Sequence, residues 1–286
     1  MLRIGSIALT LGLTATLLAA CDSDDEPKSG TTYVALGDSY VAAPNIGDRD
    51  DDNGCLRSKN NYPHLLAEKL DLALTDVSCS GATTDAIEGE QQLRGGGVDP
   101  QIEAVDDDTQ LVTLGVGFND LGLTIRVFVQ CVSLARRDPD GSPCTDADRA
   151  AGAKGTQNAL DQMDDRIGAV VETVAQRAPE AQIVLVGYPT IFPTTDTCAE
   201  LNIAAGDLPL VRHVVESLNA SAERVARKHD ATYVDTATPS KGHDICSDDP
   251  WIAGTAPASG RRGLAWHPYT EEQEMVADLL ADVVDR

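Results

Sequence analysis

The stretch Thr32-Tyr-Val-Ala-Leu-Gly-Asp-Ser-Tyr40 is an apolar run that stops at Gly37 and places Ser39 on the turn that follows. Such a β-rich run predicts a strand, and open α/β sheets bind their ligands at the carboxyl ends of strands. Gly, Asp and Ser are also common in ordinary turns and helix N-caps, so this stretch alone does not establish chemistry. It makes Ser39 a candidate nucleophile that the rest of the chain has to support.

A base for this serine is available near the other end of the chain. A serine hydroxyl attacks poorly without a neighbouring base, and histidine has a suitable pKa near neutrality. His267 precedes the run Thr270-Glu-Glu-Gln273, which is typical of a capping box with Thr270 as N-cap. We expect the positive end of that final helix to keep His267 neutral, as a base must be. His243, in another loop, is the second candidate. The remaining histidines fall in predicted helices and are interpreted as surface or packing residues: His64, His213 and His229.

Donors for a developing oxyanion follow two further strand-like runs. Acyl transfer builds negative charge on the carbonyl oxygen, so the site needs donors already aimed at it. The segment Cys79-Ser-Gly-Ala-Thr-Thr84 offers the backbone N–H of Gly81, and Gly115-Val-Gly-Phe-Asn-Asp120 offers the side-chain amide of Asn119. Each residue alone is explained as a turn or cap residue. Together with Ser39 and His267 they indicate a serine hydrolase.

These segments resemble the SGNH hydrolases, also called GDSL esterases and lipases. The resemblance covers nearly all of residues 31–286 and is carried by Gly37-Asp-Ser-Tyr40, Gly81, Asn119 with Asp120, and His267. It looks closest to the secreted, three-disulfide branch of actinobacterial esterases and lipases. The resemblance implies that Ser39 is the nucleophile and His267 the base. It also implies an oxyanion hole formed by Ser39, Gly81 and Asn119.

The chain departs from the family pattern at two positions. Many members carry an aspartate three residues before the histidine, where this chain has Leu264. The related secreted branch uses a main-chain carbonyl instead, which implies the Leu264 carbonyl as the group that orients His267; a carbonyl can hold the tautomer. Phe118 stands where glycine usually precedes the asparagine. Its ring is expected to line or narrow an acyl pocket.

Cysteine usage indicates an exported protein. Seven cysteines are present, and six remain when Cys21 is set aside, an even number that permits about 15 pairings. The family resemblance and the short loops favour Cys55–Cys79, Cys131–Cys144 and Cys198–Cys246. Because no Cys-x-x-Cys pair occurs, no metal site is expected, and no cofactor motif is present either.

The amino terminus predicts a lipoprotein signal. Residues 1–20 form a short apolar stretch after Arg3 that is typical of a signal peptide. Small residues before Cys21 resemble a bacterial lipobox, which implies cleavage there and a lipid anchor on Cys21. Residues 21–30 then form a polar tether. Plain secretion, with Cys21 incidental, is the alternative. Either way we expect the protein outside the cytoplasm, on the outer face of the cytoplasmic membrane or secreted.

Charge and length limit the partners. The formal net charge is −24, which repels nucleic acid and anionic headgroups and is interpreted as a solubility feature. Residues 31–286 suit one domain with a substantial core. We expect a monomer.

Strand-like and helical runs alternate along this domain. Strands are predicted at 32–36, 72–77, 110–116, 182–187 and 231–235, and helices near 61–70, 100–105, 149–177, 208–229 and 271–284. This order predicts an α/β fold, a three-layer α/β/α sandwich with a mostly parallel sheet of about five strands, flavodoxin-like as in SGNH hydrolases. Right-handed crossovers would bring the ends of the first three strands to one rim. The stretch 126–148 is interpreted as an insertion that shapes the substrate entrance.

The function expected from these features is a serine esterase or lipase that works through an acyl-enzyme. Ser39 lacks the Gly-x-Ser-x-Gly elbow of α/β-hydrolases. A polysaccharide O-acetylesterase or a phospholipase would use the same catalytic centre. An inactive envelope binding protein on a decayed scaffold is the non-enzymatic alternative, supported by the missing acid and Phe118.

Overall fold

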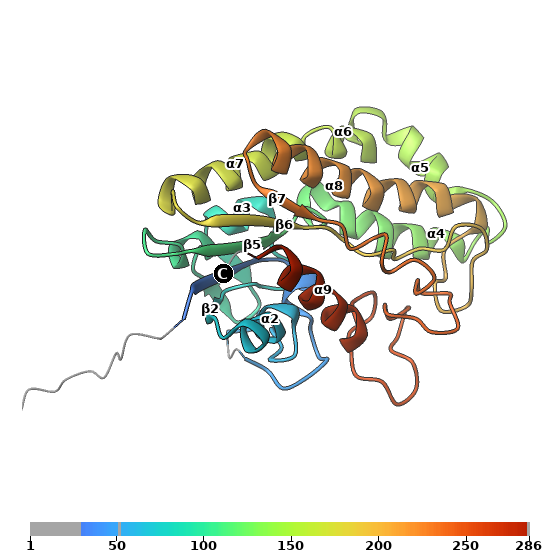
Figure 1. Cartoon of the computed structure of the whole chain (residues 1–286). Helices are drawn as coiled ribbons and strands as arrows, with labels where there is room; N and C mark the ends of the chain where they lie inside the picture. Colours follow the sequence, from blue (N-terminus) through green and yellow to red (C-terminus); the bar gives the residue numbers. More distant parts are fainter. Residues whose placement is uncertain (1–29, 51–52, 285–286) are drawn as a thin grey trace, which may run out of the picture.

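The computed structural model of the chain describes residues 30–50 and 53–284 (Figure 1). The expected signal peptide, Cys21 and nearly all of the tether lie outside the described residues. Within those residues, no helix combines the length and the hydropathy needed to cross a bilayer.

A parallel sheet forms the centre of the domain, with the strand order β2-β1-β5-β6-β7. Its strands match the five predicted runs: β1 (Thr32–Gly37), β2 (Ala73–Asp76), β5 (Leu111–Gly115), β6 (Gln182–Val186) and β7 (Thr232–Val234). The central strands read as near-continuous apolar runs because both faces of a parallel sheet are buried. The predicted fold class is confirmed.

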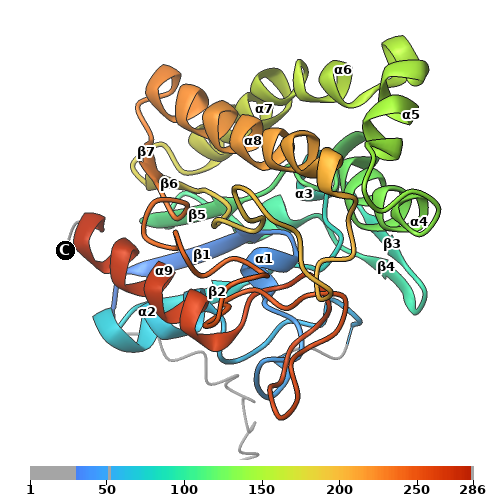
Figure 2. The ribbon, with the colours of Figure 1, turned by 90° about the vertical axis from the view of Figure 1, so that its right-hand side faces the viewer.

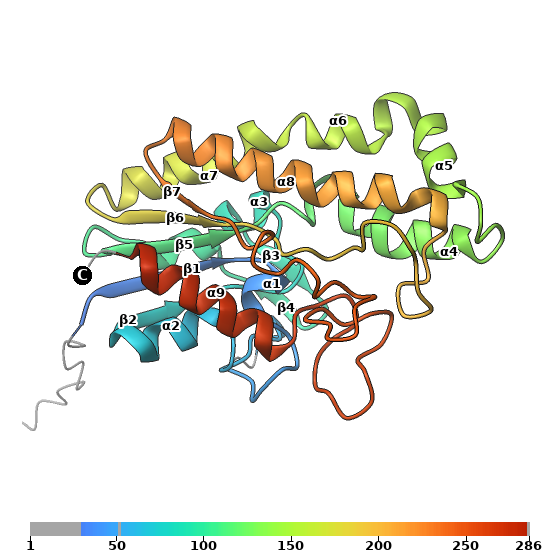
Figure 3. The ribbon, with the colours of Figure 1, turned by 45° about the vertical axis from the view of Figure 1, so that its right-hand side comes forward.

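Helices cover both faces of the sheet (Figures 2 and 3). One face packs against α2 (Tyr62–Leu70) and α9 (Thr270–Val283), whose Leu66 and Leu280 join Tyr33 of β1 in one core cluster. The other face packs against α7 (Met163–Arg177) and α8 (Leu208–Lys228), together with the short α3 (Thr84–Glu88). The chain is therefore a three-layer sandwich.

The helix expected over 149–177 is interrupted. Helix α5 (Pro143–Ala151) ends at Gly152, where φ is +54°, and α6 (Thr156–Leu160) is a separate short helix before α7. A backbone with positive φ is costly for residues other than glycine, and it cannot continue a right-handed helix. The single long helix was therefore a wrong prediction, because two glycines divide the segment.

The stretch interpreted as an insertion is largely helical. A π-helical segment, Ile125–Cys131, runs into α4 (Val132–Ala135), and this unit lies beyond the ends of the strands in Figures 1 and 3. A small antiparallel hairpin, β3 (Gln91–Leu93) and β4 (Gly96–Val98), was not predicted. Its strands are too short and glycine-rich to show alternation.

The start of α9 differs from the predicted capping box. Tyr269, not Thr270, is the N-cap, and no side chain bonds to the cap. Gln273 is fully buried, and its amide bonds to residues outside α9 as well as to Glu272 within it. It accepts from the backbone N–H of Tyr62 at 2.7 Å and donates to the carbonyl of Tyr40 at 3.0 Å. Gln273 thus joins α9 to the start of α2 and to α1 (Ser39–Ala42).

Candidate active site

Ser39 is the first residue of α1, directly after the sharp turn that ends β1. A Cβ at Gly37 would lie 2.5 Å from the carbonyl oxygen of Gly115 and 2.3 Å from Val41, so only glycine fits there. Asp38 caps the helix by accepting from the N–H of Tyr40 at 2.9 Å. These contacts hold Ser39, 8% exposed, at the carboxyl edge of the sheet.

Tyr188 links the serine turn to the turn after β5. Its hydroxyl donates to Asp38 at 2.6 Å and accepts from the N–H of Phe118 at 3.1 Å. Burial raises the pKa of Asp38 to about 7, although its hydrogen bonds with the Tyr188 hydroxyl and the N–H of Tyr40 oppose the rise. Tyr188 was not predicted from the sequence. The available signal was its place two residues after β6, at the same sheet edge as Ser39.

The segment that begins at Cys79 is bonded to the turn after β1 and to the loop that contains Cys55. Cys79 forms a disulfide with Cys55, and its N–H donates to the carbonyl of Gly37 at 3.0 Å. The N–H of Ser80 donates to the carbonyl of Cys55, also at 3.0 Å. Gly81 follows with φ of +83° and is exposed. Its position relative to the serine turn is therefore set by backbone contacts.

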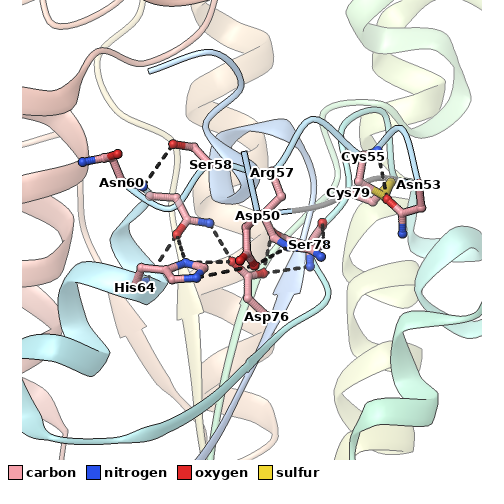
Figure 4. A network of polar contacts seen from close by, with 11 residues as sticks. Asp50, Asn53, Cys55, Arg57, Ser58, Asn60, His64, Asp76, Ser78 and Cys79 are labelled. Atoms are coloured by element: carbon pink, nitrogen blue, oxygen red, sulfur yellow. Dashed lines mark hydrogen bonds and ion pairs between the residues drawn. A yellow bond between two sulfur atoms is a disulfide. The ribbon is translucent and has the colours of Figure 1, made fainter. Parts of the chain in front are cut away.

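A polar network holds the same segment where β2 ends (Figure 4). Asp76, at the end of β2, accepts from the N–H and hydroxyl of Ser78 at 2.9 and 2.7 Å. His64 lies between Asp76 and Asp50, at 3.6 and 3.5 Å, and Arg57 donates to the carbonyl of Ser78 at 2.7 Å. His64 is a packing residue, as interpreted, but one inside a charged network.

Asn119 joins the second and third segments. Its amide nitrogen donates to the carbonyl of Ala82 at 3.0 Å, and its amide oxygen accepts from the Thr124 hydroxyl at 2.9 Å. Asp120, the next residue, accepts from the N–H of Thr84 at 3.0 Å and from the hydroxyl of the same residue. The two segments that were expected to meet at the rim are in contact.

Three donors remain available at this rim. Neither the N–H of Ser39 nor that of Gly81 bonds to any residue in the described part of the chain. The amide of Asn119 uses one hydrogen on Ala82 and keeps the other. Uncharged donors fixed by a rigid backbone are what an oxyanion requires.

The group that orients His267 differs from the expectation. Nδ1 of His267 bonds to the carbonyl of Ala265 at 2.7 Å, whereas the carbonyl of Leu264 accepts the backbone N–H of His267 at 3.2 Å. Assigning Leu264 as the orienting carbonyl was therefore wrong by one residue. Trp266 between them has φ of +67°, a tight bend that a sequence pattern does not reveal.

His267 lies beside the serine turn. The rings of His267 and Tyr40 are 5.8 Å apart between centroids, and the Tyr40 hydroxyl donates to the carbonyl of Trp266 at 2.8 Å. Desolvation lowers the pKa of His267 to about 4, while its bond to Ala265 opposes the shift. Desolvation is the largest cause that lowers the pKa of this imidazole, and the effect of the helix end stays a prediction.

His243 is engaged elsewhere. It stacks on Trp251 with 3.8 Å between ring centroids, and its Nδ1 lies 2.9 Å from the carbonyl oxygen of Asp249. These contacts favour His267 over His243 as the candidate base.

Phe118 belongs to the core. It is 2% exposed and packs against Tyr188 and Phe128 at centroid distances of 5.4 and 5.3 Å. Its ring therefore does not line an open pocket. The half-buried Phe128 instead stacks on Trp266 at 4.9 Å.

All three expected disulfides are confirmed: Cys55–Cys79, Cys131–Cys144 and Cys198–Cys246. Such bonds persist in oxidising compartments, so they indicate export. Among the described residues, no cluster of three or more His, Cys, Asp or Glu could hold a metal ion.

Comparisons with known proteins identify the family of the chain. Residues 35–271 match the GDSL-like lipase/acylhydrolase family. A protein named Lipase 2 from Streptomyces coelicolor is 38% identical over 251 residues, covering 83% of this chain and 80% of that protein.

Two solved structures share the fold. A phospholipase A1 from Streptomyces albidoflavus NA297 superposes with a TM-score of 0.69 at 26% identity, covering 88% of this chain and 98% of that one. An extracellular lipase from Streptomyces rimosus gives 0.68 at 25% identity, covering 89% of this chain and all of that one. The chain therefore belongs to the GDSL-like lipase/acylhydrolase family and is a carboxylic-ester hydrolase.

Proposed function

We propose that Ser39 is the nucleophile of this hydrolase and His267 its base. Nε2 of His267 takes the hydroxyl proton as Ser39 Oγ attacks the ester carbonyl. The oxyanion accepts from the N–H groups of Ser39 and Gly81 and from the Asn119 amide. His267 then returns the proton to the departing alcohol, which leaves an acyl-enzyme. Water, activated by the same imidazole, releases the acid.

The observation that carries this proposal is the state of His267. Its Nδ1 is committed to the Ala265 carbonyl, which can only accept a hydrogen bond, so Nδ1 carries the proton and Nε2 is the free base. The pKa lowered to about 4 keeps the ring neutral at pH 7. A carbonyl can thus perform the orienting role that an aspartate has in many relatives.

Replacing the nucleophile tests this assignment. Ser39→Ala should lower kcat for p-nitrophenyl butyrate by about 10⁴-fold or more, with an unchanged melting temperature. Turnover within tenfold of the parent chain would refute the role of Ser39. A parent chain that is itself inert would instead favour the envelope binding protein.

We further propose that the substrates are acyl lipids. Relatives that match over most of this chain include proteins named lipase and a phospholipase A1, beside one named esterase. A hollow of about 420 Å³ opens beside Gly81 and is lined by polar residues that include Glu90 and Gln91. Such a lining suits the hydroxyl-bearing alcohol of a lipid better than its acyl chain. A panel of acyl lengths, with acetylated polysaccharide as the competing substrate, tests this assignment.

We also propose that the protein is exported and carries a lipid anchor. The exported protein would act as a monomer, tethered outside the cytoplasmic membrane through a lipid on Cys21. Metabolic labelling with a tagged fatty acid tests the anchor: the parent chain should carry label, and Cys21→Ser should not. Label that persists in the variant would contradict it.

A further inference from the structure

An exposed apolar stripe lies on the segment that follows Asn119. Among the described residues, the exposed large hydrophobic side chains are Leu121, Ile125 and Val129, at 38, 62 and 59%. They are spaced four residues apart, and Ile125 and Val129 lie on one side of the π-helical segment. The other side of that segment is in the core, where Val127 and Cys131 are buried. Exposed apolar groups gathered in this way mark an interaction surface.

The stripe borders the candidate active site. Phe128, between Ile125 and Val129, stacks on Trp266, the residue before His267. At the start of the stripe, the Thr124 hydroxyl bonds to the amide oxygen of Asn119. Anything that covers the stripe would therefore lie at the mouth of the site. Figures 1 and 3 place the adjoining α4 at the end of the molecule toward which the strands run.

The charge of this segment is opposite to that of the chain. The chain has 46 acidic and 22 basic residues, yet residues 121–137 include three arginines and no acidic residue. Arg136 and Arg137 are exposed, and neither forms an ion pair with any residue of the described ranges. The net charge of −24 repels a second copy of this chain and an anionic membrane alike, so attraction to phosphates has to come from the arginines of this segment, and a zwitterionic surface carries phosphates without that repulsion. A partner that carries phosphates next to hydrocarbon fits both the stripe and the arginines.

We propose that residues 121–137 dock on a phospholipid surface. Leu121, Ile125 and Val129 enter the boundary between headgroups and acyl chains, while Arg136 and Arg137 contact phosphates. Docking would bring the mouth of the site against the lipid, so that an acyl ester reaches Ser39 without crossing water. Delivery to Ser39 rests on the proposed function, but binding to the surface does not require turnover.

Binding is tested first in the full chain carrying Ser39→Ala, so that hydrolysis plays no part. Phosphatidylglycerol or phosphatidylcholine vesicles are titrated to the point at which half of this chain sediments with them. Adding Ile125→Ser and Val129→Ser should raise that half-saturating lipid concentration by about tenfold or more. Arg136→Gln with Arg137→Gln should raise it for phosphatidylglycerol by about threefold or more. The matched controls are Gln130→Ser on the same segment and Arg227→Gln on α8, and neither should change it.

Catalysis gives the second readout. A short-chain phosphatidylcholine is compared below and above its critical micelle concentration. In the parent chain the rate should rise steeply when micelles form, and the Ile125→Ser, Val129→Ser chain should lose most of this rise while hydrolysing monomeric ester at the parent rate. Equal vesicle binding by the stripe variant and its control would overturn the docking proposal. Retained hydrolysis of monomeric ester by Ser39→Ala would instead refute the proposed function, so the two failures are separable.

Discussion

Ser39 lies on a turn whose neighbours are almost wholly buried, whereas His267 lies near the end of a long connection, residues 235–269. That connection has no helix or strand of its own apart from an isolated bridge between Ile252 and Pro268. The serine half is fixed by strand ends and by the bonds of Asp38 and Tyr188. The histidine half depends on a carbonyl two residues away and on Trp266 packing against Phe128.

The two halves of the site are therefore held in position in different ways. Strands of a sheet are rigid, so hydrogen-bond donors that follow them closely are also held rigidly. A loop has to gain its order from local contacts, and here tight turns and aromatic packing provide it. In the histidine half a backbone carbonyl orients the imidazole, and desolvation lowers its pKa so that the ring is neutral at pH 7.

Among changes that keep Ser39 and His267, removing a donor from the rigid half should have the largest effect. Asn119→Ala should lower kcat by about 10²–10³-fold with little change in KM, because the amide acts on the charge that develops in the transition state. Asn119→Asp keeps an oxygen that can accept from Thr124 but loses the N–H donor to the oxyanion. Its kcat should therefore fall as far as that of Asn119→Ala. Ester kinetics for both variants, with melting temperatures, would measure this. A kcat within threefold of the parent would remove Asn119 from the oxyanion hole.

This half of the site was also the easier one to predict. Ser39, Gly81 and Asn119 each follow a strand-like run, and the carboxyl ends of parallel strands share one edge. The five strands were predicted because a buried strand is apolar along its whole length. The carbonyl of Ala265 was missed because any residue has a carbonyl, and only the bend at Trp266 selects it. Tyr188 was missed because its role appears only when β6 lies next to β5.

A smaller loss is expected when the two turns are uncoupled. Tyr188→Phe leaves the buried carboxyl of Asp38 without its phenol donor and the N–H of Phe118 without its acceptor. Unfilled buried hydrogen-bonding groups should cost about 1–3 kcal/mol of unfolding free energy, and kcat should fall by about tenfold. Denaturant unfolding and ester kinetics measure both effects.

Tyr233→Phe on β7 is the matched control, since no hydrogen bond of its hydroxyl is found among the described residues. It should be close to neutral. Equal behaviour of the two variants would show that the turns do not depend on this bond.

The histidine half should give a pH profile displaced toward acid. A base works in its neutral form, which predominates above its pKa, and desolvation lowers the pKa of His267 from 6.5 to about 4. At pH 5 the site should therefore retain most of its kcat/KM, whereas a histidine at its ordinary pKa would leave about 3%. Because Asp38 has a pKa raised to about 7, the profile should also be measured in Asp38→Asn. An acid limb near pH 6.5 in both chains would contradict the lowered pKa.

The most direct test of the central claim is covalent labelling with a fluorophosphonate in the parent chain and in His267→Gln. The account predicts that mass spectrometry finds the adduct on Ser39 alone, and that the labelling rate falls by about 10³-fold or more in His267→Gln. An equal rate in the two chains, or an adduct on another residue, would contradict it.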